Sequence, residues 1–190
     1  MKENKIIYNL LKLIYVPLIK IIYRPTVKGI ENIPNEGLII LAGNHIHAID
    51  PILVMANTKR AVHFLAKESL FKGIGGIILK CVGTIKVYRT QNNPDAIIEA
   101  VKVLKQQGCV GIFPEGTRNK TTQKLLQFKH GTVVIAKQTN SKIVPFAITG
   151  NYKLFRKNIT IEFGKPIDIS KMEIEEANNY LRKNVDKLLK

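Results

Sequence analysis

Short apolar runs alternate with segments of helical pattern after Arg24-Pro25, and this alternation constrains the fold more than any other feature of the chain. Six runs have the length and composition of β-strands: residues 37–42, 62–66, 84–89, 109–113, 143–148 and 159–163. Helices are expected between them at 51–57, 68–80, 94–107 and 128–138, with a charged helix at 173–189. Such alternation predicts an α/β fold, with a mixed, largely parallel sheet covered by helices on both faces.

The N-terminal run from Ile6 to Ile22 is mostly apolar. Three polar residues of the run, Asn9, Lys12 and Lys20, fall within one narrow stripe at helical spacing together with Lys5, which precedes it. The run is short for a transmembrane span, its lysines and Pro17 weaken that interpretation further, and no signal-peptide cleavage pattern follows. A broad apolar face with a thin basic stripe favours a helix lying in a membrane interface, and a helix packed on the protein core is the alternative. We therefore divide the chain into a membrane-associating helical segment, 1–24, and an α/β domain, 25–190.

The balance of charge predicts an anionic partner. Thirty Lys and Arg residues against fourteen Asp and Glu residues give a formal net charge of +16. Nucleic acid, a lipid surface and a phosphorylated substrate would all suit this charge. The basic residues are dispersed, tryptophan is absent and no nucleic-acid-binding motif is present, so nucleic acid is not the expected partner. Cys81 and Cys109 lie in apolar runs without a Cys-x-x-Cys pair, and we expect both to be reduced thiols of the core.

The stretch "AGNHIHAIDP", residues 42–51, places His45, His47 and Asp50 within six positions. Pro51 is expected in the first turn of a helix, which makes Asp50 the expected N-cap and residues 43–50 a loop. In a helix, His47 and Asp50 would share a face, whereas a loop lets either histidine meet the carboxylate. A helix cap beside two polar loop residues, a His-Asp pair and a metal site are therefore all open. No further ligand set is evident in the sequence, so we expect no metal.

A second stretch, "GIFPEGTRNK" at 111–120, follows a predicted buried strand. Gly116, Thr117 and Arg118 would offer backbone N–H groups, a hydroxyl and a guanidinium fork, a combination that suits a phosphate. Arg89 ends another predicted strand and could face the same crevice, because sites in such sheets gather where strands end. A plain surface turn with a solvated arginine is the alternative.

Taken together and in this order, these stretches resemble the glycerolipid acyltransferase family, specifically its 1-acyl-glycerol-3-phosphate (lysophosphatidate) acyltransferases. The similarity spans about residues 25 to 165, and its most specific part is "FPEGTR", which matches at every position from Phe113 to Arg118. The other matching positions are Asn44, His45 and Asp50 in the Asn-His-x4-Asp motif, Gly83 and Arg89 in the second block, Pro145 in the fourth, and Lys67 in "FLAKESLF". His47 and Lys86 depart from the usual pattern, and Lys86 leaves the second block a partial match.

This resemblance implies transfer of a fatty acyl group from an acyl thioester to the sn-2 hydroxyl of 1-acyl-glycerol-3-phosphate, which gives phosphatidate in phospholipid biosynthesis. His45 would be the general base and Asp50 the carboxylate that fixes its tautomer and stabilises the imidazolium. The substrate hydroxyl would be the nucleophile, because the sequence has no Gly-x-Ser-x-Gly elbow and its cysteines are expected to be buried. No acyl-enzyme is therefore expected.

The remaining expectations also follow from the resemblance. The acceptor phosphate would be bound by Arg118, Arg89, Thr117 and Gly116. Supporting roles would fall to Glu115, Lys67 and Asn44: Glu115 would organise the turn, and Lys67 or loop N–H groups would stabilise the oxyanion. No cofactor is expected beyond an acyl-CoA or acyl-carrier protein as donor substrate. The partners would be lysophosphatidate, the thioester and an anionic membrane surface, with a peripheral or monotopic location at the cell membrane and the active site on its cytoplasmic side.

Overall fold

The computed structural model describes residues 5–88 and 94–190. Its elements run in the order α1 (Lys5–Tyr23), β1 (Thr26–Lys28), η1 (Ile30–Asn32), β2 (Ile39–Gly43), α2 (Asp50–Ala56), β3 (Val62–Lys67), η2 (Glu68–Phe71), α3 (Gly73–Cys81), β4 (Ile85–Val87), α4 (Pro94–Lys105), β5 (Cys109–Ile112), α5 (Gly131–Thr139), β6 (Lys142–Gly150), β7 (Ile159–Phe163) and α6 (Ile174–Leu188), where η marks a short 3-10 helix. The six predicted strands are all present. The three-residue strand β1 was not predicted.

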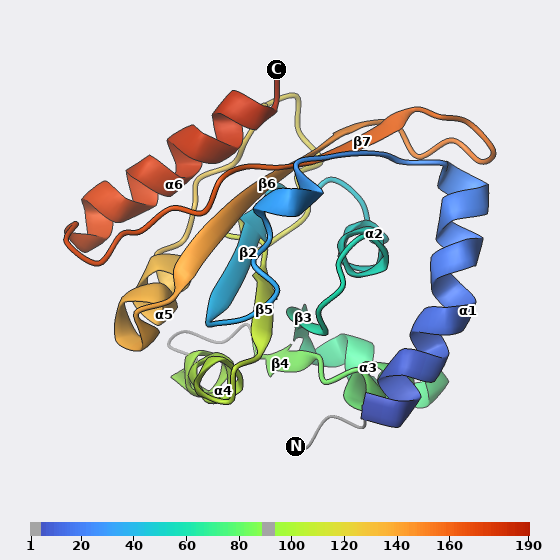
Figure 1. The fold of residues 1–190 in the computed structure, drawn as a ribbon, viewed down its shortest axis with the longest axis horizontal. Coiled ribbons are helices and arrows are strands. Elements are labelled where there is room, and N and C mark those ends of the chain that lie inside the picture. The colour runs from blue at the N-terminus through green and yellow to red at the C-terminus, as the bar shows by residue number, and fades with distance from the viewer. Residues whose placement is uncertain (1–4, 89–93) are drawn as a thin grey trace.

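The described strands form one sheet in the order β1-β7-β6-β2-β5-β3-β4 (Figure 1). Neighbouring strands are parallel in every pair except β6 and β7, which are antiparallel. This arrangement confirms the predicted mixed, largely parallel sheet. It also places the C-terminal ends of β2, β3 and β5 at one edge of the sheet, where their following loops meet.

Helices cover both faces of the sheet, as the apolar runs predict. Along β2, Ile39 and Leu41 join the core under α1 and α2, whereas Ile40 and Ala42 join the core under α4, α5 and α6. Figure 1 shows these two groups of helices on opposite sides of the sheet. Because successive side chains of a strand point to opposite faces, continuous apolar runs are what a sheet buried on both sides requires.

Most predicted helices match the observed ones within three residues at each end. The exception is the predicted helix at 68–80, which is two elements, η2 and α3. The break falls at Lys72 and Gly73, where the chain becomes extended and Gly73 then takes a φ of 62°. The left-handed conformation suits glycine, and together with the extended Lys72 it separates η2 from α3.

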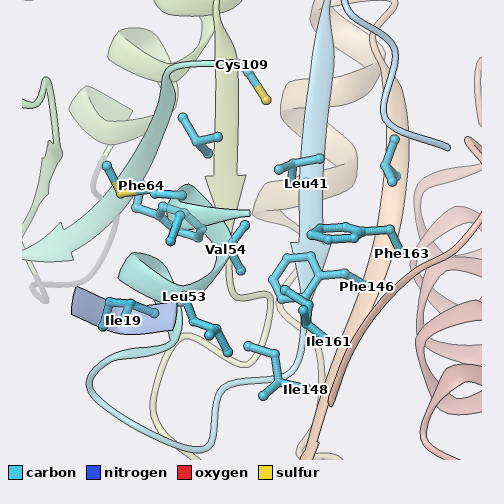
Figure 2. Packing of buried hydrophobic residues seen from close by; sticks show 14 of the residues in the cluster. Ile19, Leu41, Leu53, Val54, Phe64, Cys109, Phe146, Ile148, Ile161 and Phe163 are labelled. Carbon is cyan, nitrogen blue, oxygen red and sulfur yellow. The ribbon is translucent and has the colours of Figure 1, made fainter. Parts of the chain in front are cut away.

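Helix α1 has two different apolar faces. One face packs on the protein: Tyr8, Ile19 and Tyr23 are buried in the core on the α2 side of the sheet. Figure 2 shows Ile19 in the same cluster as Leu53 and Val54 of α2. The other face leaves five large apolar side chains exposed: Leu10, Leu13, Ile14, Leu18 and Ile21. Within the part of the chain that the structure describes, no helix is long and apolar enough to cross a membrane. The division into a membrane segment, 1–24, and a domain, 25–190, stays a prediction.

Candidate active site

The two motifs singled out in the sequence lie side by side at the C-terminal edge of the sheet. Strands β2 and β5 are parallel neighbours, with Ala42 opposite Ile112 in register. The loop 44–49 leaves β2, and the turn 113–118 leaves β5, from this shared edge. The backbone N–H of Asn119 also donates to the carbonyl of His45 at 2.7 Å. Residues seventy positions apart in sequence therefore form one site.

The structure pairs Asp50 with His45 and not with His47. Nδ1 of His45 lies 2.8 Å from Oδ2 of Asp50, with the imidazole 17% exposed and the carboxylate fully buried. Residues 44–49 are a loop, as expected, and this loop lets residues five apart meet. The predicted N-cap at Asp50 is wrong: α2 begins at Asp50 itself, and Ile49 before it already has helical angles. The carboxylate points back to the loop because N–H groups there need an acceptor.

Asp50 is held by four donors. Its Oδ2 accepts the backbone N–H groups of Ile46 and His47, both at 2.7 Å, in addition to the imidazole. Its Oδ1 accepts a hydrogen bond from the hydroxyl of Tyr152. Burial, and then the charge of Asp50, raise the pKa of Tyr152 well above its usual range, so the phenol stays protonated and donates. A buried carboxylate that accepts hydrogen bonds at both oxygens has one defined orientation.

Tyr152 was not among the residues predicted from the sequence. It lies 102 positions after Asp50, just beyond strand β6, and it reaches the site because β6 pairs with β2. Its ring stacks on His47 with centroids 4.1 Å apart and meets Tyr23 of α1 edge-on at 5.4 Å. The only local signal was a tyrosine four residues after the strand predicted at 143–148. That signal cannot identify its partner.

His45 is held in place by contacts of its ring and of its backbone. Its ring stacks on Phe113 at 4.1 Å with 13° between the planes, and Phe113 also stacks with Phe64 at 5.2 Å. Its backbone N–H donates to Oε1 of Glu115 at 2.9 Å. Among the described residues, Nε2 has no hydrogen-bond partner. The nitrogen remote from Asp50 is therefore free to bind a ligand.

Glu115 and Asn44 hold the loop in place. Glu115 is 3% exposed and bridges two segments, since its second oxygen accepts the backbone N–H of Leu126 at 2.9 Å. Asn44 continues the β2–β6 pairing with its side chain: it donates to the carbonyl of Ile148 at 2.8 Å and accepts from the N–H of the same residue at 2.7 Å. Both contacts are structural, and both fix the backbone next to His45.

His47 has other contacts. Its Nδ1 accepts the backbone N–H of Ile49 at 3.3 Å, and its ring lies against Tyr152. No group of three or more His, Cys, Asp or Glu side chains within 5–88 and 94–190 is placed to hold a metal ion. Cys109 is a buried core thiol, as expected, and its burial raises the pKa of the thiol to about 12. Cys81 is only half-buried, so the expected core position is wrong for this residue.

The expected phosphate-binding residues lie in the turn beside His45. Gly116 has a φ of 66°, and a side chain there would meet that of Lys129, whose Cε lies 2.9 Å from the Cβ position. Thr117 and Arg118 are exposed, and neither side chain has a partner among the described residues. Their donors are therefore available to an anion, and Lys129 adds a cation that the sequence interpretation did not include.

Two predicted residues are not joined to this cluster. Arg89 lies outside the described residues. Lys67 is exposed at the end of β3, on the same edge of the sheet, but no hydrogen bond or ion pair of the described chain connects it to His45, Asp50 or Arg118. Its suggested role at an oxyanion stays a prediction.

This arrangement, an α/β fold with a buried His-Asp pair beside an exposed Gly-Thr-Arg turn, agrees with what the comparisons find. A family model described as Acyltransferase matches residues 24–149, and the chain belongs to this family. The chain is 32% identical over 170 residues to the 1-acyl-sn-glycerol-3-phosphate acyltransferase of Borreliella burgdorferi. The matched region covers 86% of this chain and 68% of that protein.

Two further matches extend the comparison. The 1-acyl-sn-glycerol-3-phosphate acyltransferase of Bacillus subtilis is 33% identical over 144 residues, 72% of this chain and 70% of the relative. The crystal structure of the 1-acyl-sn-glycerophosphate (LPA) acyltransferase from Thermotoga maritima shares the fold, with a TM-score of 0.75 at 24% identity, over 97% of this chain and 77% of that one.

Proposed function

We propose that this protein transfers a fatty acyl group from an acyl thioester to the sn-2 hydroxyl of 1-acyl-glycerol-3-phosphate, which yields phosphatidate for phospholipid biosynthesis. Membership of the acyltransferase family and two relatives that carry this activity in their names support the substrate class. The observation that carries the proposal is the 2.8 Å contact between His45 and Asp50 beside the 113–118 turn.

In the proposed reaction, Nε2 of His45 takes the proton of the acceptor hydroxyl as its oxygen attacks the thioester carbonyl. Asp50 holds Nδ1–H and stabilises the imidazolium that forms. The tetrahedral intermediate then collapses, the carbon–sulfur bond breaks, and the imidazolium returns its proton to the leaving thiolate. Atoms and charges balance without an acyl-enzyme, and the reaction uses no metal or redox cofactor.

The acceptor phosphate binds at Gly116, Thr117 and Arg118 in this proposal, with Arg89 as a second cation. An arginine fork suits two phosphate oxygens, and the backbone N–H groups of Thr117 and Arg118 add donors. The N–H of Gly116 instead donates to the carbonyl of Phe113 at 2.9 Å, so glycine contributes the tight turn rather than a donor. Lys67 or backbone N–H groups of the 44–49 loop stabilise the oxyanion. Either acyl-CoA or acyl-carrier protein, both acidic, would be attracted to a chain of formal charge +16.

The proposal includes peripheral or monotopic attachment to the cell membrane through α1, with the active site on the cytoplasmic side. The exposed face of α1 carries Leu13, Leu18 and Ile21, each more than half exposed. Apolar side chains on one helix face, with lysines nearby, suit the headgroup boundary of an anionic bilayer. Acceptor and product both partition into lipid, so attachment brings the enzyme to its substrate.

The test is mass spectrometry of the lipids formed from 1-acyl-glycerol-3-phosphate with each of the two donors. We expect phosphatidate whose added chain matches the donor, at the sn-2 position, and the free thiol as coproduct. A parallel incubation with lysophosphatidylcholine should give far less product, because its phosphate carries a choline. Failure to form phosphatidate with either donor would refute the proposed function.

A further inference from the structure

The loop between β6 and β7, residues 151–158, exposes two large apolar side chains at its tip. Leu154 is 61% exposed and Phe155 is 64% exposed. Phe155 also has a φ of 57°, which is unusual for a residue with a bulky side chain. Two large apolar side chains therefore face solvent at a strained turn. A loop without a partner would be expected to bury these side chains or to carry polar residues in their place.

This loop is fastened to the end of α1. The backbone N–H of Phe155 donates to the carbonyl of Ile22 at 2.6 Å, and Figure 1 shows the loop reaching the C-terminal end of the helix. Two exposed apolar residues of the helix, Leu18 and Ile21, lie within four positions of that carbonyl. The apolar tip of the loop therefore adjoins the exposed apolar face of α1.

Cations surround the apolar tip, and no acid lies within the loop. Its basic residues are Lys153, Arg156 and Lys157, all exposed. A cavity of about 720 Å³ beside it is lined by four cations from three segments, and no carboxylate lines it: Lys20, Arg24, Lys59 and Lys157. None of these four forms an ion pair with a carboxylate of the described residues. Unneutralised cations around a concave surface attract anions, and the cavity is large enough for a phosphate headgroup.

We propose that the 151–158 loop is a second membrane-contacting element, which inserts Leu154 and Phe155 into the headgroup boundary of an anionic bilayer. Lys153, Arg156 and Lys157, with the cations of the cavity, then contact lipid phosphates. Two apolar residues flanked by cations match the layers of such a surface, where apolar side chains sit below the phosphates and cations sit among them. The apolar tip of the loop adjoins the apolar face of α1 that is proposed to bind the membrane. We therefore expect the loop to contact the same lipid surface rather than a separate protein partner.

The position of the loop gives this contact a consequence for the site. Tyr152, which holds Asp50, lies two residues before Leu154. Lipid bound at the loop tip is therefore close along the chain to the His45–Asp50 pair. This inference rests on the membrane attachment included in the proposed function but not on the acyl-transfer reaction.

The experiment uses the absence of tryptophan from the chain. Three full-length variants each carry one fluorophore: Phe155→Trp at the loop tip, Leu13→Trp on α1, and Tyr180→Trp on α6 as the matched control. Tyr180 is 38% exposed and belongs to α6, a helix on the opposite side of the sheet from α1 (Figure 1). Each variant is mixed with vesicles of phosphatidylglycerol and phosphatidylcholine, with and without brominated acyl chains.

We expect a blue shift and bromine quenching for Phe155→Trp and Leu13→Trp, and neither for Tyr180→Trp. Quenching of Leu13→Trp without quenching of Phe155→Trp would overturn the loop proposal while leaving attachment through α1 intact. Absence of both responses would overturn both. A loop response of equal size with pure phosphatidylcholine vesicles would overturn the assignment of the cations to anionic headgroups.

A second variant tests the contact without a fluorophore. Leu154→Ser with Phe155→Ser should weaken co-sedimentation with the anionic vesicles by roughly tenfold, because it removes two apolar anchors. The thermal midpoint should stay near that of the parent, since both side chains are exposed. Unchanged co-sedimentation of the folded double variant would contradict the proposal, and binding by the parent to a protein but to no vesicle would identify a protein surface instead.

Discussion

Replacing Asp50 by asparagine removes one charge from the candidate site while keeping its shape. Oδ2 of Asp50 accepts two backbone N–H groups and the imidazole N–H, so the amide oxygen of the variant must occupy this position. The amide nitrogen then replaces Oδ1 and faces Tyr152, whose hydroxyl can rotate to accept a hydrogen bond. Every buried polar group keeps a partner, and His45 keeps its tautomer.

The energetic cost divides into stability and catalysis. Bonds to a carboxylate contribute about 1.5–3 kcal/mol and neutral bonds about 0.5–1.5 kcal/mol, so the two backbone bonds should lose about 2 kcal/mol of unfolding free energy together. A unit charge ~4 Å from an imidazolium contributes about 4 kcal/mol at an effective dielectric of ~20, which corresponds to a loss of about 10³-fold in turnover. Asp50→Asn should therefore fold and be nearly inactive.

Two assays separate these effects. Phosphatidate formation at saturating substrates measures turnover, and urea denaturation measures the unfolding free energy of Asp50→Asn beside Asp50→Ala. The alanine variant should be less stable than the asparagine variant, because it leaves the N–H groups of Ile46 and His47 without an acceptor. Turnover of folded Asp50→Asn within tenfold of the parent would refute the claim that the negative charge of Asp50 stabilises the imidazolium of His45 during the reaction.

Three further predictions concern the surroundings of this pair. Arg118→Ala should raise the apparent KM for lysophosphatidate and leave the apparent KM for the donor nearly unchanged. Arg118→Lys should restore the KM for lysophosphatidate only in part, because lysine lacks the bidentate fork. Steady-state kinetics with each substrate varied in turn would measure both KM values. Tyr152→Phe should lower kcat by up to ~10–100-fold at unchanged KM, the equivalent of one bond to a charged group. Tyr152→Leu should lower kcat similarly and also lose stability, because the ring contacts with His47 and Tyr23 disappear. A folded Tyr152→Phe with the kcat of the parent would exclude a role for the hydroxyl. Leu13→Gln with Leu18→Gln should reduce vesicle co-sedimentation without unfolding the protein, since both side chains are exposed; full retention of binding would exclude this face of α1.

The architecture follows from the sequence because apolar alternation is a local signal with a global consequence. Runs buried on both faces specify strands of a covered sheet, and six of them lie where the pattern indicates. The strand β1 was missed because it has only three residues, none of them fully buried, and it forms by pairing with β7 across the whole chain. A local pattern carries no information about such a partner.

The candidate site was predictable where its motifs are local and not where tertiary pairing creates it. The sequence indicates the loop that lets a histidine meet Asp50, but it leaves His45 and His47 both open. The family resemblance selected His45, and the structure confirms that contact, although the predicted cap geometry was wrong. Tyr152 depends on the β2–β6 pairing, and Lys129 on the packing of its side chain over Gly116. Helix α1 is similar: its composition predicts an apolar surface, but which face packs on the core depends on contacts with α2.

The most direct test of the central claim compares phosphatidate formation by His45→Ala and His47→Ser at saturating lysophosphatidate and donor. Only His45 contacts Asp50 through its ring and has a second nitrogen without a partner among the described residues. His45→Ala should lose ~10²–10⁴-fold in turnover, the usual contribution of a positioned base, while His47→Ser keeps most of the parent rate. An active, folded His45→Ala beside an inactive, folded His47→Ser would contradict the assignment of His45 as the base.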